Sequence, residues 1–167
     1  YVESLEQGAT VGNAYANRGQ TLGPLTSKQY EVGVKTERRG WAATAALFRI
    51  ERGAEYANAG NVLVQDGLSV YQGLELGASK RAGAWTVGGN LMLLDSEYRK
   101  GSDYNGKRVA GAPRFVAAGQ VVYRVPQVQG LRLRADFKYT GSTMLRPAND
   151  VKTSGYTIVN VCASYET

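Results

Sequence analysis

The chain of 167 residues contains no histidine, one cysteine, two methionines and four prolines. Without histidine, acid–base catalysis by an imidazole and a Ser-His-Asp triad are both excluded. The single cysteine, Cys162, excludes an internal disulfide framework, and a zinc site of the usual Cys/His kind is excluded with it. We therefore predict that the protein is not an enzyme.

Long apolar runs are also absent. The longest, 41–48 and 91–94, are far shorter than the ~20 residues that a membrane-spanning helix needs. The first residues have neither the basic start nor the apolar core of a signal peptide, so we expect the chain to begin within a structural element.

What is abundant points to β-structure. There are 21 glycines and 11 tyrosines, and apolar and polar residues alternate with period two. The clearest case is Leu131–Tyr139, where leucine, alanine and aromatic residues alternate with arginine, aspartate and lysine without an exception. The alternation predicts an all-β protein, an antiparallel up-and-down meander of about seven strands, near 27–38, 40–51, 71–81, 83–98, 113–125, 130–140 and 154–166.

The predicted connections alternate in length. Short turns follow the first, third and fifth strands, whereas the intervening connections, 52–70, 99–112 and 141–153, are long, and residues 1–26 resemble the end of a further long loop. Short periplasmic turns and long extracellular loops are typical of outer-membrane β-barrels. We therefore expect the three long connections to emerge from the same end of the sheet.

The alternation alone leaves the environment of the apolar face open. In an outer-membrane barrel this face contacts lipid, whereas in a soluble barrel or sandwich it forms the core. One alternative is therefore a small β-barrel, soluble or in the outer membrane, that binds a small apolar ligand. Such a complete barrel of eight strands would need one more strand, and we expect residues 1–26 to be too rich in glycine and asparagine to supply a good one.

Five segments, in order, resemble those of TonB-dependent outer-membrane siderophore receptors. They cover the chain from about residue 20 to the end, with the spacing of that family. The segments are Ser27-Lys-Gln-Tyr-Glu-Val-Gly-Val-Lys35, the run Trp41–Arg52, Tyr71-Gln-Gly-Leu-Glu-Leu-Gly-Ala-Ser79, Gly106-Lys-Arg-Val-Ala-Gly-Ala-Pro-Arg-Phe115 and Tyr139-Thr-Gly-Ser142.

The resemblance implies a segment of a 22-stranded transmembrane β-barrel in the bacterial outer membrane. Residues 1–167 would form a single segment from the C-terminal half of the barrel domain, without the plug domain and the final strands. The implied function is TonB-dependent import of a ferric siderophore, with the siderophore as transported ligand and no cofactor or metal site. The implied partners are outer-membrane lipid, the TonB complex, the plug domain and the siderophore.

The resemblance implies that the loops 1–26, 52–70, 99–112 and 141–153 help to bind an anionic ferric chelate. The charged residues alternate along strands instead of clustering as a nucleic-acid site would require. We predict no nucleic-acid partner. The net charge of +6 then reflects a polar lumen lining. As an isolated fragment, the segment should have open edges at 27–38 and 154–166 and self-associate. Candidate contacts for an anionic ferric chelate are Tyr56, Tyr71, Tyr104, Arg108 and Arg146.

Overall fold

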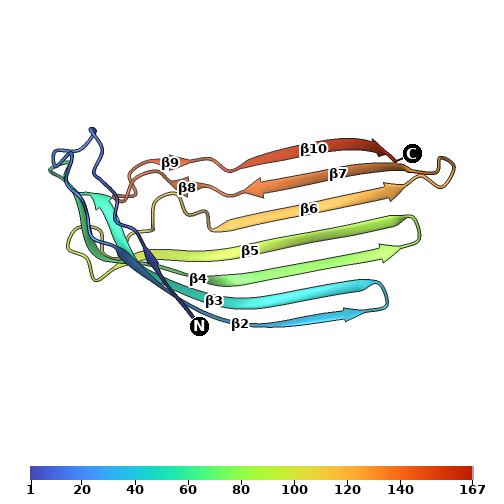
Figure 1. Cartoon of the computed structure of the whole chain (residues 1–167), viewed down its shortest axis with the longest axis horizontal. Coiled ribbons are helices and arrows are strands. Elements are labelled where there is room, and N and C mark those ends of the chain that lie inside the picture. The colour runs from blue at the N-terminus through green and yellow to red at the C-terminus, as the bar shows by residue number, and fades with distance from the viewer. Residues whose placement is uncertain (167) are drawn as a thin grey trace.

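The computed structural model describes residues 1–166 and consists of β-strands. Eight strands form one antiparallel sheet in the order β1-β2-β3-β4-β5-β6-β7-β10, and β8 and β9 form a separate pair within a loop (Figure 1). The strands are β1 (Val2–Glu6), β2 (Leu25–Arg38), β3 (Trp41–Ala57), β4 (Leu63–Ala82), β5 (Trp85–Arg99), β6 (Phe115–Arg124), β7 (Leu131–Thr140), β8 (Thr143–Met144), β9 (Lys152–Thr153) and β10 (Tyr156–Tyr165).

The predicted meander and the predicted common end of the long connections are confirmed. Short turns at 39–40, 83–84 and 125–130 lie at one end of the sheet, and connections 58–62, 100–114 and 141–155 lie at the other (Figure 1). Arg39 and Gly40 both have positive φ (46° and 80°), as a two-residue hairpin turn of type I′ requires. We call the two ends the turn end and the loop end.

The prediction that 52–70 is a loop is wrong. Strands β3 and β4 continue through this segment, with Tyr56 opposite Val64, and only 58–62 connect them. The register of β3 with β4 changes at a β-bulge, which lies between Gly53 and Glu55. Because a bulge inserts an unpaired residue, it breaks the period-two pattern that identifies a strand in the sequence.

The sheet has one strand more than predicted. Residues 2–6 form β1 and pair with β2, with Val2 opposite Gln29, so the prediction that residues 1–26 supply no strand is wrong. Strand β1 covers β2 only at Leu25–Gln29, so the rest of β2 and all of β10 remain open edges. The predicted edges at 27–38 and 154–166 are therefore confirmed over most of their length. These edges do not pair with each other, so the eight strands do not form the small closed barrel that was the alternative.

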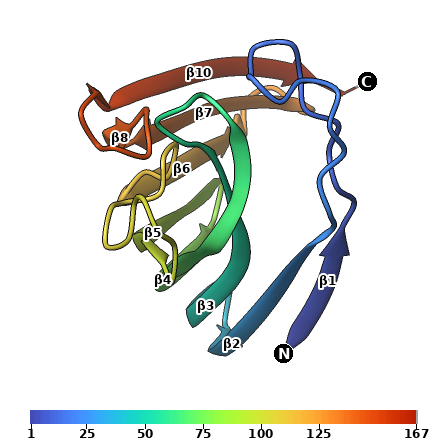
Figure 2. The same cartoon turned by 90° about the vertical axis from the view of Figure 1, so that its left-hand side faces the viewer.

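The sheet is a curved wall with little interior. Viewed from the loop end, its strands follow an arc that is open on one side (Figure 2). The buried apolar cluster lies at the loop end, where the extended β3–β4 hairpin and strand β5 pack against residues of 100–114. No helix among residues 1–166 has the length and hydropathy needed to cross a membrane.

Close strand packing explains one interior glycine and gives a prediction. A Cβ on Gly73 would lie 2.1 Å from the Leu93 carbonyl oxygen and 2.9 Å from the Phe48 ring. Because backbone cannot move aside cheaply, we expect Gly73→Ala to destabilise the wall by roughly 1–3 kcal/mol. Gly12→Ala is the matched control, since nothing lies within 4 Å of the Gly12 position. Urea unfolding midpoints of the two variants check this, and equal midpoints would contradict it.

Candidate functional site

The two faces of the wall have opposite chemistry. Residues paired across antiparallel strands point to the same side, so the register assigns every strand residue to a face. On one face, exposed apolar side chains form a continuous band, with Val34 74% and Val161 82% exposed. No charged residue interrupts it. The band comprises Val32, Val34, Ala45, Leu47, Leu74, Leu76, Val87, Leu91, Leu93, Ala117, Val121, Ala135, Phe137, Val159 and Val161.

Both edges of the band have the composition of a membrane interface. At the turn end lie Trp41 and the stacked pair Trp85–Tyr123, whose ring centroids are 4.4 Å apart. At the loop end, Arg49, Gln72 and Asp95 occupy neighbouring strands, and the Arg49 guanidinium donates to Gln72 at 2.8 Å.

The height of the band matches a bilayer. From Trp85 to Asp95 strand β5 advances ten residues, or about 33 Å along the strand at ~3.3 Å per residue. A tilt of about 40° reduces this to ~25 Å, the height of the apolar band in outer-membrane barrels. The membrane-spanning part of each strand therefore ends near the Arg49–Gln72–Asp95 row.

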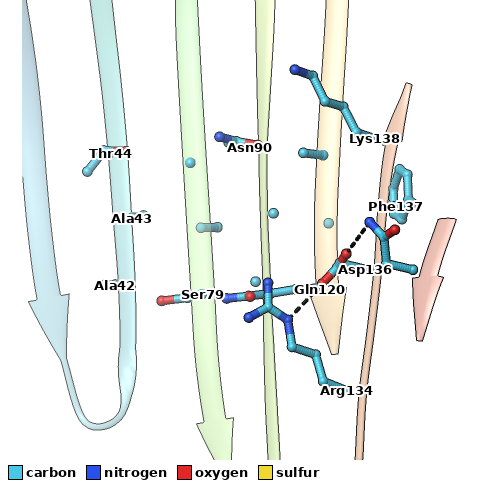
Figure 3. Close-up of a pocket in the computed structure, with 17 residues that line it drawn as sticks. Ala42, Ala43, Thr44, Ser79, Asn90, Gln120, Arg134, Asp136, Phe137 and Lys138 are labelled. Atoms are coloured by element: carbon cyan, nitrogen blue, oxygen red, sulfur yellow. Dashed lines mark hydrogen bonds and ion pairs between the residues drawn. The ribbon is translucent and has the colours of Figure 1, made fainter. Parts of the chain in front are cut away.

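The opposite face is polar and borders a hollow of about 620 Å³. In Figure 3, Arg134, Asp136 and Lys138 project over the small residues of the neighbouring strands. Asp136 accepts hydrogen bonds from Arg134 Nε at 2.7 Å and Asn160 Nδ2 at 2.9 Å. The predicted alternation of Leu131–Tyr139 is thus confirmed: its charged residues share the polar face and its apolar residues the other.

Three further residues lie on the polar face of the wall. Cys162 is paired with Arg134 and therefore shares that face. Tyr98 and Tyr156 lie near strand ends, as residues of an aromatic girdle do, but the register also places them on the polar face. Strand β10 carries apolar residues on both faces, so its sequence does not determine its orientation.

Three of the five predicted site residues meet in one cluster at the loop end. The Tyr56 and Tyr104 rings are 4.8 Å apart, and Tyr71 packs against the same cluster, which is centred on Tyr98 and Tyr56. Burial, followed by the hydrogen bond to Asp66, raises the pKa of Tyr56 to about 12. The hydroxyl of Tyr56 is thus already engaged within the protein.

The other two, Arg108 and Arg146, meet through Asn149. The Asn149 side chain accepts from the Arg108 backbone N–H at 2.8 Å and donates to the carbonyl oxygens of Arg108 (2.9 Å) and Arg146 (3.3 Å). This amide joins connections 100–114 and 141–155. Arg146 pairs with Asp150 at 3.3 Å, whereas the buried Nε of Arg108 has no hydrogen-bond partner among residues 1–166.

The side chain of Arg108 is partly buried and has few hydrogen-bond partners among the described residues. Burial lowers the pKa of Arg108, and the nearby Arg114 lowers it further. Its only side-chain hydrogen bond among residues 1–166 is a long one, from Nη2 to the Ala112 carbonyl oxygen at 3.4 Å.

Sequence reasoning missed three residues that organise this end of the wall: Asp66, Tyr98 and Asn149. The sequence Asp66-Gly67 is a turn signal, and it marks the bulge that places Asp66 beside Tyr56 and Ser102. Nothing local in the sequence indicates the partners of Asn149. Within the described part of the chain, no three His, Cys, Asp or Glu residues gather as a metal site.

Comparison with known families accounts for this wall. The family model "TonB dependent receptor-like, beta-barrel" matches residues 3–167. The chain belongs to that family. It is accordingly a segment of a bacterial outer-membrane receptor barrel, and the family consists of transport receptors, not enzymes.

Two curated relatives are similar to almost the whole segment. The ferrichrome outer membrane transporter/phage receptor of Escherichia coli (strain K12) is 29% identical over 179 residues. The ferrichrome receptor FcuA of Yersinia enterocolitica is 28% identical over 177 residues. Each alignment covers 99% of this chain and 23% of the relative, so the segment spans about a quarter of their length.

Solved structures show the same fold. The ferric yersiniabactin uptake receptor FyuA of Yersinia pestis aligns with a TM-score of 0.77 and 21% identity, over 98% of the segment and 26% of that chain. BauA, the ferric preacinetobactin receptor of Acinetobacter baumannii, aligns with a TM-score of 0.75 and 22% identity, over 97% of the segment and 26% of that chain.

The facing of the wall predicts how it tolerates charge. Leu91 and Asn90 are adjacent in the middle of β5, on the apolar and polar faces respectively. An arginine on the lipid face near the bilayer midplane costs roughly 2–4 kcal/mol. We expect Leu91→Arg to reduce the folded fraction of the intact receptor and Asn90→Arg to leave it nearly unchanged, as measured by the heat-modifiable band in gel electrophoresis. A larger loss for Asn90→Arg would reverse the face assignment.

Asp66, which lies beyond the membrane-spanning part of β4, predicts a pH dependence. Ser102 donates its hydroxyl (2.6 Å) and backbone N–H (2.7 Å) to the Asp66 carboxylate, and with Tyr56 it lowers the pKa of Asp66. A lowered pKa means stability that is present above the unfolded value, about 3.9, and is lost as pH falls through the folded value.

We therefore expect the hydrogen-exchange protection of the Ser102 amide to fall below about pH 4 and to remain level between there and neutral pH. Asp66→Asn should abolish this pH step, because the amide side chain does not titrate. A step that persists in the Asn variant, or that occurs with rising pH, would contradict the assignment.

Proposed function

We propose that this segment forms part of the barrel wall of a receptor that imports a ferric siderophore across the outer membrane, with energy supplied through TonB. The observation that carries the proposal is the opposition of an exposed apolar band and a polar face within one curved sheet of this family. A wall of this kind separates lipid from an aqueous interior. The ferric-chelate receptors among its relatives and structural neighbours support the ligand class.

The loop end supports a role in binding. Connections 100–114 and 141–155 are held together by Asn149 and by the hydrogen bond from the Gly111 N–H to the Met144 carbonyl oxygen at 2.8 Å. They therefore form one ordered lobe at the end of the wall that faces the exterior. An ordered lobe can present a binding group with little loss of conformational entropy on binding.

Among the five candidate contacts, Arg108 is the best placed for an anionic chelate. Tyr56 is engaged by Asp66 and Arg146 by Asp150, and Tyr71 and Tyr104 pack with the aromatic cluster. Arg108 alone combines partial burial with a free donor among the described residues. We assign to it the electrostatic contact and to the tyrosines the support of the lobe.

The remaining partners follow from the same placement. The polar face would contact the plug domain and water, and the apolar face would contact outer-membrane lipid. The sheet edges β1 and β10 would pair with neighbouring strands of the barrel. As an isolated fragment, the segment would expose both edges together with its apolar band, and we expect it to self-associate.

Uptake in cells tests the proposal. The intact receptor, as the only siderophore receptor of an otherwise receptor-deficient host, should import iron from ferrichrome or another ferric siderophore of a test panel. Removal of TonB should abolish import while leaving binding intact. Binding of an apolar solute without any ferric chelate, or import that is independent of TonB, would overturn the proposal.

The site assignment is tested by binding measurements on the same receptor. Arg108→Gln should weaken binding of the imported chelate by about tenfold or more, because a hydrogen bond to a charged group contributes about 1.5–3 kcal/mol. Arg146→Gln is the matched control from the neighbouring connection. Equal losses in the two variants would show that charge in the lobe matters in general and not the position of Arg108.

A further inference from the structure

The two edges of the apolar band differ in how their charges are paired. At the loop end, the three cations that the strands place on the apolar face each have a carboxylate partner. Lys28 pairs with Glu3 at 3.9 Å, Arg49 pairs with Glu51 at 2.7 Å, and Arg99 pairs with Glu97. These three cations are therefore paired within the protein.

At the turn end, the outward cations have no such partner. Arg38 on β2 and Lys80 on β4 both lie directly opposite Trp41 on β3, so all three side chains are on the apolar face. Arg39 occupies the adjacent turn. None of the three forms an ion pair with a carboxylate of residues 1–166, and all are exposed. Two carboxylates lie at this end. Glu37 is on the polar face, and Glu166 pairs with Arg132.

The distribution of charge along the wall has the same asymmetry. The turn end, taken as 35–41, 79–87, 121–134 and 162–166, carries eight cations and two carboxylates, a net charge of +6. This equals the net charge of the whole chain, because the remaining residues hold twelve cations and twelve carboxylates. The excess positive charge is therefore concentrated at the turn end of the wall. Of the cations in its strands, Arg38 and Lys80 lie on the apolar face, and the others lie on the polar face.

We propose that Arg38, Lys80 and Trp41 form a binding site for the phosphate headgroup of an anionic phospholipid in the periplasmic leaflet. Arg38 and Lys80 supply charge-assisted donors to a phosphodiester, and the Trp41 ring lies at headgroup depth, as interfacial tryptophans do. Surface lysine and arginine side chains are attracted to the negative potential of an anionic leaflet. Carboxylates, which would compete for these cations, are absent from this face at this end among the described residues.

The adjoining surface suits an acyl chain. Trp41 and Lys80 border a hollow of about 750 Å³ on the apolar side, with Val87 and Phe137 also at its boundary. Its floor includes Ala78, Gly89 and Gly119, whose small side chains leave room beside the wall. Headgroup and chain would then contact neighbouring parts of one surface. The inference depends on the barrel-wall placement but not on which solute the receptor transports.

Native mass spectrometry of the intact receptor, released from detergent and titrated with phosphatidylglycerol or phosphatidylethanolamine, tests the site. We expect phosphatidylglycerol to bind more tightly than phosphatidylethanolamine. Arg38→Gln/Lys80→Gln should weaken phosphatidylglycerol binding about 30-fold, which corresponds to about 2 kcal/mol. Lys28→Gln, which removes an outward cation from the other edge, should leave binding unchanged, and the charge-preserving Arg38→Lys/Lys80→Arg should retain most of it.

Several results would contradict the proposed lipid site. Equal affinity of the wild-type receptor for the two lipids, or an equal loss in the Lys28→Gln receptor, would overturn the site. If the double variant does not assemble, Lys80→Gln alone should weaken binding about fivefold, and no change there would overturn it as well. Since siderophore uptake is not the readout, failure of this site and failure of the transport proposal are separable.

Discussion

Every backbone N–H and C=O group inside a bilayer needs a hydrogen-bond partner within the protein, because hydrocarbon supplies none. Within the apolar band, the antiparallel ladder meets this requirement for β3 to β7, which have a partner strand on both sides, whereas β1 covers β2 only at Leu25–Gln29. The open sides of β2 from Tyr30 to Arg38 and of β10 also need hydrogen-bond partners, which neighbouring strands of a barrel would supply. The curvature, the facing of side chains and the position of the loops all follow from that ladder.

Once the ladder fixes the register, the alternation of apolar and polar residues along each strand gives the wall one apolar face and one polar face. The apolar residues have no core to enter, which is why Val34 and Val161 are 74% and 82% exposed, and their burial is left to lipid. Charges are consequently confined to the polar face, as in the Arg134–Asp136 pair, and to the two edges of the band. Paired charges at the loop end and unpaired cations at the turn end then distinguish the two membrane interfaces.

The sequence predicted those features that depend on local periodicity. Leu131–Tyr139 gave strand β7 and both of its faces, because each polar position there is charged. The segment 52–70 could not be read in this way, since the bulge near Asp66 shifts the period where the strands continue. The facing of Cys162 depends on the register of β10 with β7, which places Cys162 opposite Arg134. The Asn149 bridge joins residues 41 positions apart in the sequence. Contacts of this kind are set by the three-dimensional register and leave no local pattern.

One face of the wall contacts lipid, and the other face contacts water. Spin labels placed one at a time along β5, from Trp85 to Arg99, in the reconstituted intact receptor test this arrangement most directly. Accessibility to oxygen should be high at odd positions and accessibility to a water-soluble nickel reagent high at even positions, and the outward positions should change from oxygen to nickel near Asp95. Accessibility without a period of two, or with odd and even positions exchanged, would contradict the account.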